Sequence, residues 1–140
     1  METGKLGYAF RNFPLDGLHP NAFGAAKAAA CARRQDKFWE MHDWIFSNQR
    51  QLSPIDLTAH ARELRIDEHR FAECLEDVSM EVKNDAEEGR RLGINSTPTF
   101  FIGDIGHDGK VSVRRRITGA VPVDVFRAAI TELLGSVPKA

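Results

Sequence analysis

The stretch from Gly93 to Gly103 constrains the fold more than any other part of the chain; it runs Gly-Ile-Asn-Ser-Thr-Pro-Thr-Phe-Phe-Ile-Gly. A helical pattern ends at Gly93, and a short apolar run begins after Pro98. Because proline cannot donate a hydrogen bond to a sheet ladder, Pro98 belongs at the first residue of a strand or at an edge. The Thr97–Pro98 step is a candidate cis peptide bond, but only about 5–6% of X-Pro bonds in folded proteins are cis. Spacing alone therefore favours a trans proline that begins a strand.

The chain as a whole predicts a strand, a block of helices, a hairpin and a final helix. Leu6, Tyr8 and Phe10 recur at a period of two, which is typical of a strand over residues 6–13. Ser53, Asp67 and Ser79 are candidate helix N-caps, and Gly93 is a candidate C-cap residue. The predicted helices span residues 20–34, 37–48, 54–64, 68–77, 79–92 and 123–134, and the predicted hairpin strands span residues 99–102 and 111–117, joined by a turn over residues 103–109.

Composition and charge exclude several classes of protein. The hydrophobic content of 42% and the balance of 19 basic against 20 acidic residues are ordinary for a globular domain and indicate neither nucleic acid nor a membrane surface as a partner. No apolar run approaches the ~20 residues that a membrane span needs. The N-terminus has no basic segment followed by an apolar one, so we expect a cytoplasmic protein as written. A preceding segment that carries a signal would instead direct it to the periplasm or outside the cell.

Two cysteines, Cys31 and Cys74, are present, and no Cys-x-x-Cys pair occurs in the 140 residues. This count excludes a disulfide-dense scaffold and a four-cysteine zinc site. The two residues are either buried structural thiols or a disulfide that braces the helices; the disulfide requires Cα atoms within about 7 Å. Redox catalysis by either cysteine is the least favoured of the three interpretations.

Other polar residues do not indicate a cofactor or a metal. The five histidines form no HExxH motif and have no tight spacing to the cysteines, so we expect no metal site and no cofactor. Arg114, Arg115 and Arg116 alternate in a predicted strand, which favours a solvated edge over an anion-binding patch.

Six blocks of sequence occur in the order in which they occur in one known family, and they cover essentially the whole chain. They are Arg11–Leu15, His19–Ala22, Phe38–Asp43, Phe46–Gln49, Phe71–Leu75 and Gly93–Ile102. In these blocks the chain resembles the DsbA-type thiol:disulfide oxidoreductases. The resemblance implies an α+β fold of the thioredoxin type in one domain, with a helical insertion over about residues 20–92 and a core over about residues 4–15 and 93–135.

The resemblance also implies a binding site. It implies that the Thr97–Pro98 peptide bond is cis. It also implies that Ser96, Thr97 and Pro98 form the loop that holds an extended peptide or protein substrate. Such binding is β-augmentation, in which main-chain hydrogen bonds hold the peptide and side-chain pockets discriminate.

The chain departs from the family at the redox centre, because family members carry a Cys-x-x-Cys at a helix N-terminus after an earlier strand. The resemblance therefore implies that the first strand–helix unit is missing, and no catalytic residue can be assigned. We expect the C-terminal portion of an oxidoreductase that is inactive alone, or a degenerate peptide-binding module without redox chemistry. A glutathione-linked isomerase or transferase is a weaker third interpretation. Strand edges left open by a missing strand also predict a homo-oligomer that fills the gap.

Overall fold

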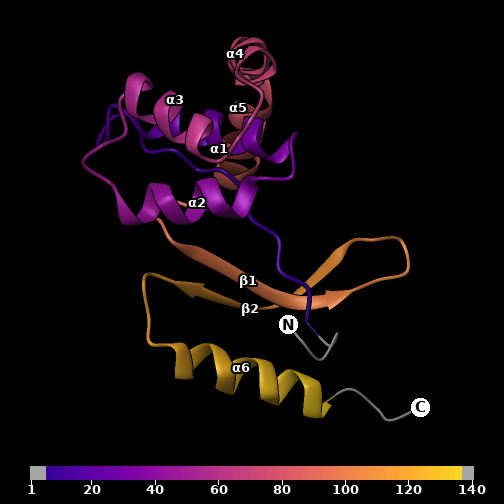
Figure 1. Cartoon of the computed structure of the whole chain (residues 1–140). Coiled ribbons are helices and arrows are strands. Elements are labelled where there is room, and N and C mark those ends of the chain that lie inside the picture. Colours follow the sequence, from indigo (N-terminus) through magenta and orange to yellow (C-terminus); the bar gives the residue numbers. More distant parts are fainter. Residues whose placement is uncertain (1–5, 137–140) are drawn as a thin grey trace. The chain divides into compact units, whose positions relative to one another are not determined.

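The computed structural model describes residues 6–136, and these form parts of two compact units (Figure 1). Of the described residues, 6–92 belong to the first unit and 93–136 to the second. Within residues 6–136, the first unit contains five helices, whereas the second contains a two-stranded sheet and one helix. The architecture is α+β, as predicted. Residues 4 and 5 of the predicted core lie outside the described part.

The helices of the first unit surround one central helix. α1 (Ala22–Arg33) contacts each of the other four. It is buried on nearly every side, and five of its buried residues are alanines, whose short side chains let the neighbouring helices approach closely. The other helices are α2 (Phe38–Ser47), α3 (Pro54–Glu63), α4 (Glu68–Asp77) and α5 (Ser79–Arg91).

Side-chain caps begin α3 and α4 as the sequence predicts. The Ser53 hydroxyl accepts a hydrogen bond from the Asp56 amide, and the Asp56 carboxylate accepts one from the Ser53 amide, which is a capping box. Asp67 caps α4 through the amide of Arg70. The predicted cap at Ser79 is wrong, because Val78 occupies the N-cap position in a helical conformation. The chain passes from α4 into α5 almost without a break, which leaves no extended residue to serve as a cap.

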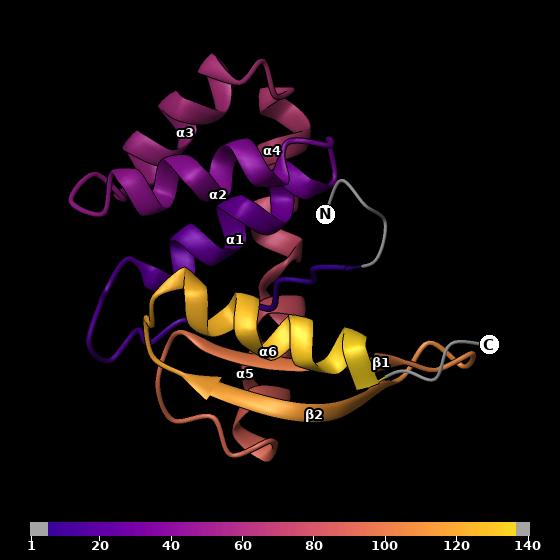
Figure 2. The same ribbon diagram turned by 90° about the horizontal axis from the view of Figure 1, so that it is seen from below.

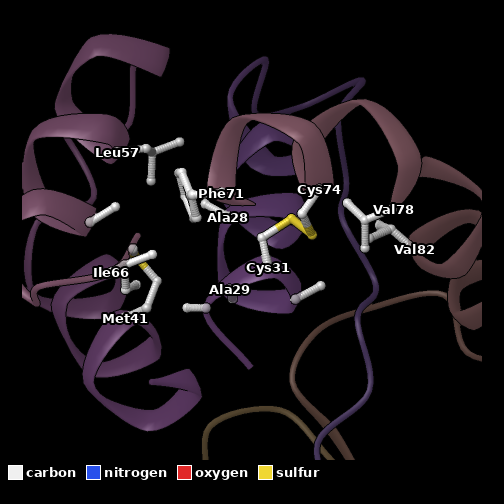
Figure 3. Close-up of a cluster of buried hydrophobic side chains, with 13 residues drawn as sticks. Ala28, Ala29, Cys31, Met41, Leu57, Ile66, Phe71, Cys74, Val78 and Val82 are labelled. Atoms are coloured by element: carbon white, nitrogen blue, oxygen red, sulfur yellow. A yellow bond between two sulfur atoms is a disulfide. The ribbon is translucent and has the colours of Figure 1, made fainter. Parts of the chain in front are cut away.

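The core of the first unit lies between all five of its helices, α1 to α5 (Figure 3). Phe71, Met41, Val78 and Val82 are its largest fully buried side chains. Cys31 of α1 and Cys74 of α4 are joined by a disulfide within this cluster, and their Cα atoms lie 5.7 Å apart. Neither residue is therefore a free thiol.

The predicted strand over residues 6–13 does not form. These residues have no regular secondary structure, because a strand needs a hydrogen-bonded neighbour and the described residues supply none for them. The alternating residues Tyr8 and Phe10 nevertheless pack together against the same helix. The ring of Tyr8 lies 5.6 Å from that of Trp39, and the ring of Phe10 lies 5.5 Å from that of Phe38, so both side chains pack on α2.

The second unit is built on the antiparallel strands β1 (Thr99–Ile105) and β2 (Val111–Thr118). β1 extends beyond the predicted end at Ile102, because Gly103 lies in an irregularity of the ladder and not in the turn. A Cβ atom on Gly103 would lie 2.1 Å from the carbonyl oxygen of Ser112, so only glycine fits there. The helix α6 (Val123–Ser136) follows the sheet.

The two faces of this sheet differ. α6 covers one face, where Phe100 makes an edge-to-face contact with Phe126 and Arg115 pairs with Glu132 at 3.0 Å (Figure 2). Cross-strand partners share a face, so the pairs Phe101–Arg116, Gly103–Val113 and Ile105–Val111 lie on the other one. Three apolar side chains of this second face are exposed, at 69% for Ile105, 53% for Val111 and 53% for Val113.

Candidate functional site

The turn from Gly93 to Pro98 is held by two hydrogen bonds that side chains donate to its backbone carbonyl oxygens. Gly93 has φ +71°, which is the left-handed conformation that favours glycine after a helix, as the sequence predicts. Its carbonyl oxygen accepts a hydrogen bond of 2.8 Å from the Arg116 guanidinium. At the other end, the Ser96 carbonyl oxygen accepts one of 2.8 Å from the Thr99 hydroxyl. The turn therefore holds its shape through groups on β1 and β2.

The Thr97–Pro98 peptide bond within this turn is cis. The Pro98 carbonyl oxygen accepts a hydrogen bond of 2.8 Å from the Gly119 amide, which continues the ladder by one step beyond β1 and β2. Thr97 and Pro98 are exposed, and Ser96 is half-buried. Within residues 6–136, neither the amide nor the carbonyl of Thr97 has a backbone hydrogen-bond partner. The turn thus presents an exposed main-chain donor and acceptor directly before a strand.

The strand β1, which follows Thr97 and Pro98, also has an unpaired edge. In the described part of the chain the sheet has two strands, so β2 pairs with one edge of β1 and the other edge has no partner strand. An extended peptide could pair with such an edge through its own main chain, since unpaired strand edges are templates for strand addition.

The three consecutive arginines each have a partner in this unit. Arg114 pairs with Asp104 at 2.9 Å, and Arg115 pairs with Glu132. Arg116 binds the Gly93 carbonyl and lies over the Phe101 ring, 5.6 Å from its centroid. This agrees with the edge-strand interpretation and leaves no cluster of uncompensated cations for an anion.

The histidines lie apart from one another. Among residues 6–136, no three potential ligands of the His, Cys, Asp or Glu type gather to hold a metal ion. His42 packs among the aromatic rings of α2 and the N-terminal segment, 4.6 Å from the ring of Phe46. His60 stacks on Trp44 at 4.3 Å, and its Nδ1 lies 2.9 Å from a Glu63 carboxylate oxygen.

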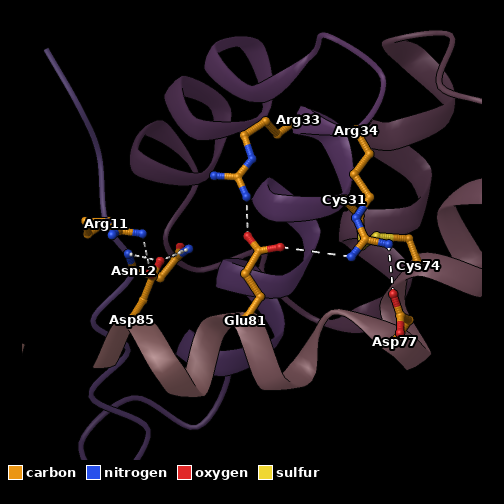
Figure 4. Close-up of polar contacts among 9 residues, drawn as sticks. All are labelled: Arg11, Asn12, Cys31, Arg33, Arg34, Cys74, Asp77, Glu81 and Asp85. Atoms are coloured by element: carbon orange, nitrogen blue, oxygen red, sulfur yellow. Dashed lines mark hydrogen bonds and ion pairs between the residues drawn. A yellow bond between two sulfur atoms is a disulfide. The ribbon is translucent and has the colours of Figure 1, made fainter. Parts of the chain in front are cut away.

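Asp85 is an important residue that the sequence interpretation missed. Its carboxylate is buried on α5 and accepts hydrogen bonds from the Arg11 guanidinium, the Asn12 amide and the Asn12 side chain at 2.9–3.1 Å (Figure 4). It therefore fixes the N-terminal segment to the helix. The sequence pattern could have identified Asp85, because this residue lies at helical spacing with the other buried residues of α5, Val82, Ala86 and Gly89. A carboxylate on an apolar stripe implies a dedicated partner.

The fold and this loop define a thioredoxin-like protein. A sequence model of the family described as thioredoxin matches residues 1–116. The chain belongs to this family.

The chain is also similar to several much longer proteins. It is 37% identical over 108 residues to the Na(+)/H(+) antiporter NhaA 1 of Salinispora arenicola and to the Na(+)/H(+) antiporter NhaA 3 of Salinispora tropica, in each case over 76% of this chain and 17% of the relative. It is 30% identical over 113 residues to the Na(+)/H(+) antiporter NhaA of Nitrosospira multiformis, over 79% of this chain and 18% of the relative. The chain thus spans about a sixth of the length of these relatives. No solved structure gives a significant match.

None of the helices found in residues 6–136 is long and apolar enough to cross a membrane.

Proposed function

We propose that this chain is the C-terminal portion of a DsbA-like thiol:disulfide oxidoreductase whose redox Cys-x-x-Cys lies outside these 140 residues. In this proposal the loop of Ser96, Thr97 and Pro98 holds an extended peptide or protein beside the redox centre. The peptide adds to the unpaired edge of β1 through its main chain, and the loop supplies the first donor and acceptor.

A single observation carries the proposal. Thr97 is exposed, and its amide and carbonyl have no backbone partner within the described residues, although Pro98 and Thr99 on its C-terminal side are hydrogen-bonded. Exposed main-chain groups aligned with a strand suit peptide capture better than small-molecule binding, because a peptide backbone offers the matching acceptor and donor.

The chain alone should not exchange disulfides at this loop. Exchange needs a thiolate to attack and a second thiol to resolve the mixed disulfide. Both cysteines of the chain are bonded to each other on α1 and α4. We therefore expect no catalysed reduction of insulin by the 140-residue protein, and no difference between it and the variant with both Cys31→Ala and Cys74→Ala. Catalysis that the double variant loses would contradict this assignment of the redox centre.

Peptide binding tests the loop directly. Fluorescence anisotropy would compare an extended peptide with the same peptide methylated at alternate backbone nitrogens. We expect methylation to weaken binding about ten-fold or more, and we expect Thr97→Ala to change it less than about two-fold, because two lost hydrogen bonds to the main chain outweigh a side-chain contact. The opposite pattern would show that the side chain, and not the backbone, holds the peptide.

The alternative proposal is a degenerate thioredoxin-like module that binds peptides without redox chemistry. This alternative needs no Cys-x-x-Cys, and none occurs in the 140 residues. The coding sequence before Met1 discriminates the two, since an in-frame strand that ends in Cys-x-x-Cys supports the oxidoreductase, and a stop codon there supports the binding module.

The similarity to Na(+)/H(+) antiporters supports a shared thioredoxin-like segment and not ion transport by this chain. The family match covers residues 1–116, and the alignment with the Salinispora arenicola relative covers 108 residues, so most of the aligned residues must lie inside the family match. We propose that the longer relatives contain a segment of the same fold.

A further inference from the structure

The two cysteine residues of the disulfide are both buried and differ slightly in exposure. Cys31 is 1% exposed and lies inside α1, whereas Cys74 is 6% exposed. Cys74 also lines a surface pocket of about 250 Å³, together with Gln35 and the charged residues Arg34, Arg70, Glu73 and Asp77. Of the two cysteines, Cys74 therefore lies at the pocket, and Cys31 is not among its lining residues.

The charges around the pocket are unevenly compensated. Arg34 pairs with Asp77 at 3.0 Å, and the carboxylate of Glu73 lies 3.5 Å from the His69 ring. Arg70 is exposed, and within residues 6–136 its guanidinium forms no ion pair. Figure 4 shows the Arg34 side chain extending past the disulfide toward Asp77. Arg70 thus has no ion-pair partner among the described residues, and Arg34 lies at the same pocket paired with Asp77; the carboxylates of Glu73 and Asp77 line this pocket as well.

We propose that the Cys31–Cys74 disulfide is a thiol-exchange site, attacked at Cys74 by a small carboxylate-bearing thiol that enters this pocket. The thiolate sulfur of the small thiol forms a bond to Sγ of Cys74 as the Cys31–Cys74 bond breaks. The electron pair of the broken bond goes to Sγ of Cys31, which takes a proton from water. A second molecule of the thiol then attacks the mixed disulfide and releases Cys74 as a thiol.

The overall reaction is balanced: two small thiols are oxidised to their disulfide as the protein disulfide is reduced to two thiols. Arg70 attracts the carboxylate of the reagent, and Arg34 stabilises negative charge on the sulfur atoms during exchange. Reduction removes the covalent link between α1 and α4 in the core of the first unit. The site is separate from the Ser96–Pro98 loop and does not depend on the function proposed for that loop.

Reduction kinetics of the whole 140-residue protein test the route of attack. The probes are glutathione, 2-mercaptoethanol and cysteamine, which are anionic, neutral and cationic, compared at equal thiolate concentration. We expect rates that rise in proportion to thiol concentration, with glutathione about two- to five-fold faster than cysteamine at low salt and equal to it at about 1 M salt. The proposal is overturned if the reduction rate levels off at high thiol concentration, because local unfolding of the protein would then limit the reaction. It is also overturned if the rate does not depend on the charge of the thiol.

Substitutions identify the guanidinium responsible. Arg70→Gln should abolish the preference for glutathione, whereas Arg91→Gln, which removes an exposed arginine of α5 away from the pocket, should retain it. A preference that survives Arg70→Gln, or that Arg91→Gln removes equally, contradicts the role of Arg70.

A matched pair of cysteine variants tests which sulfur is attacked. Cys31→Ala leaves Cys74 as a free thiol, and Cys74→Ala leaves Cys31, so both variants lose the same disulfide. Mass spectrometry would follow the formation of the mixed disulfide with oxidised glutathione. We expect Cys74 to react at least about ten-fold faster, because it lines the pocket and Cys31 does not. Equal rates, or a faster reaction of Cys31, contradict attack at Cys74.

Discussion

The two units of the chain differ in how much of their stability they provide for themselves. The first unit buries a continuous cluster that extends from Ala28 to Val82 and joins two of its helices by a disulfide. In the second unit, within the described residues, Ile117 and Ala129 are the buried hydrophobic side chains, and one sheet face leaves Ile105 and Val113 exposed. The helical unit has a continuous buried core, whereas the hairpin unit buries few apolar side chains and leaves one sheet face exposed.

This difference follows from how helices and strands satisfy their backbone hydrogen bonds. Helices satisfy their backbone groups internally, so the first unit can be stable without other strands. A two-stranded sheet leaves two edges open and is marginally stable at best without further packing. The unpaired strand edge and the exposed apolar sheet face therefore lie in the second unit, and it is there that we propose a peptide or a second copy of the chain binds.

The largest expected effect is on the core of the first unit. Phe71 is its largest fully buried side chain, and Phe71→Ala should lower the free energy of unfolding of this unit by about 3–5 kcal/mol. Chemical denaturation followed by tryptophan fluorescence measures this, since Trp39 and Trp44 both lie on α2. Phe46→Ala serves as the control, because Phe46 is 58% exposed and should cost less than about 1 kcal/mol. Equal losses from both variants would show that the cluster is not the stabilising core.

A smaller effect is expected where the N-terminal segment joins α5. Asp85→Asn replaces one carboxylate oxygen with an NH2 group; because both Asn12 donors share Oδ2 and Arg11 contacts Oδ1, that NH2 must face one of these sets of donors, and the charge that pairs with Arg11 is lost. We expect a loss of about 1–2 kcal/mol and faster amide exchange in residues 6–15. Glu88→Gln is the matched control, since Glu88 also contacts Arg11 but is exposed. If Asp85→Asn leaves exchange in residues 6–15 unchanged, another contact holds the segment.

We propose that the chain self-associates, so that a second copy covers the unpaired part of the sheet in the second unit. Analytical ultracentrifugation should show a concentration-dependent dimer. Val113→Lys places a charge on the exposed sheet face and should raise the dissociation constant about ten-fold, or about 1.4 kcal/mol. Val123→Lys, at the exposed start of α6, should leave it unchanged. A protein that stays monomeric at high concentration contradicts the proposal.

The structural features that were predicted correctly from the sequence are those that depend on residues close together in the chain. Ser53 and Asp67 begin helices because their caps need only the next three residues, and Gly93 ends one because its own backbone permits φ +71°. The strand over residues 6–13 failed because it needs a distant partner that the alternation of Tyr8 and Phe10 cannot supply.

Contacts between distant residues were likewise not predictable from local pattern. The spacing of Cys31 and Cys74 left both buried thiols and a disulfide open, because the pairing depends on how α1 packs on α4. Gly103 was interpreted as a turn residue, although the approach of the Ser112 carbonyl from the opposite strand is what requires glycine there. For the loop, the order of the sequence blocks suggested Ser96, Thr97 and Pro98, whereas the unpaired backbone of Thr97 became visible only in the structure.

The smallest expected effect concerns an exposed ion pair of the first unit. The Arg62 guanidinium donates two hydrogen bonds, of 2.8 and 2.7 Å, to the Glu68 carboxylate, and these bonds lower the pKa of Glu68. A lowered pKa means that the pair stabilises the fold above the unfolded pKa of glutamate, about 4.3, and that this contribution is lost as the pH falls through the lowered value. NMR titration should find the Glu68 pKa below the ordinary value for glutamate, and Arg62→Gln should raise it. The change in stability should be small, because water screens exposed pairs. A large loss of stability from Arg62→Gln at pH 7 would place this surface pair among the structural contacts and would weaken the contrast between the buried carboxylate of Asp85 and the exposed one of Glu68.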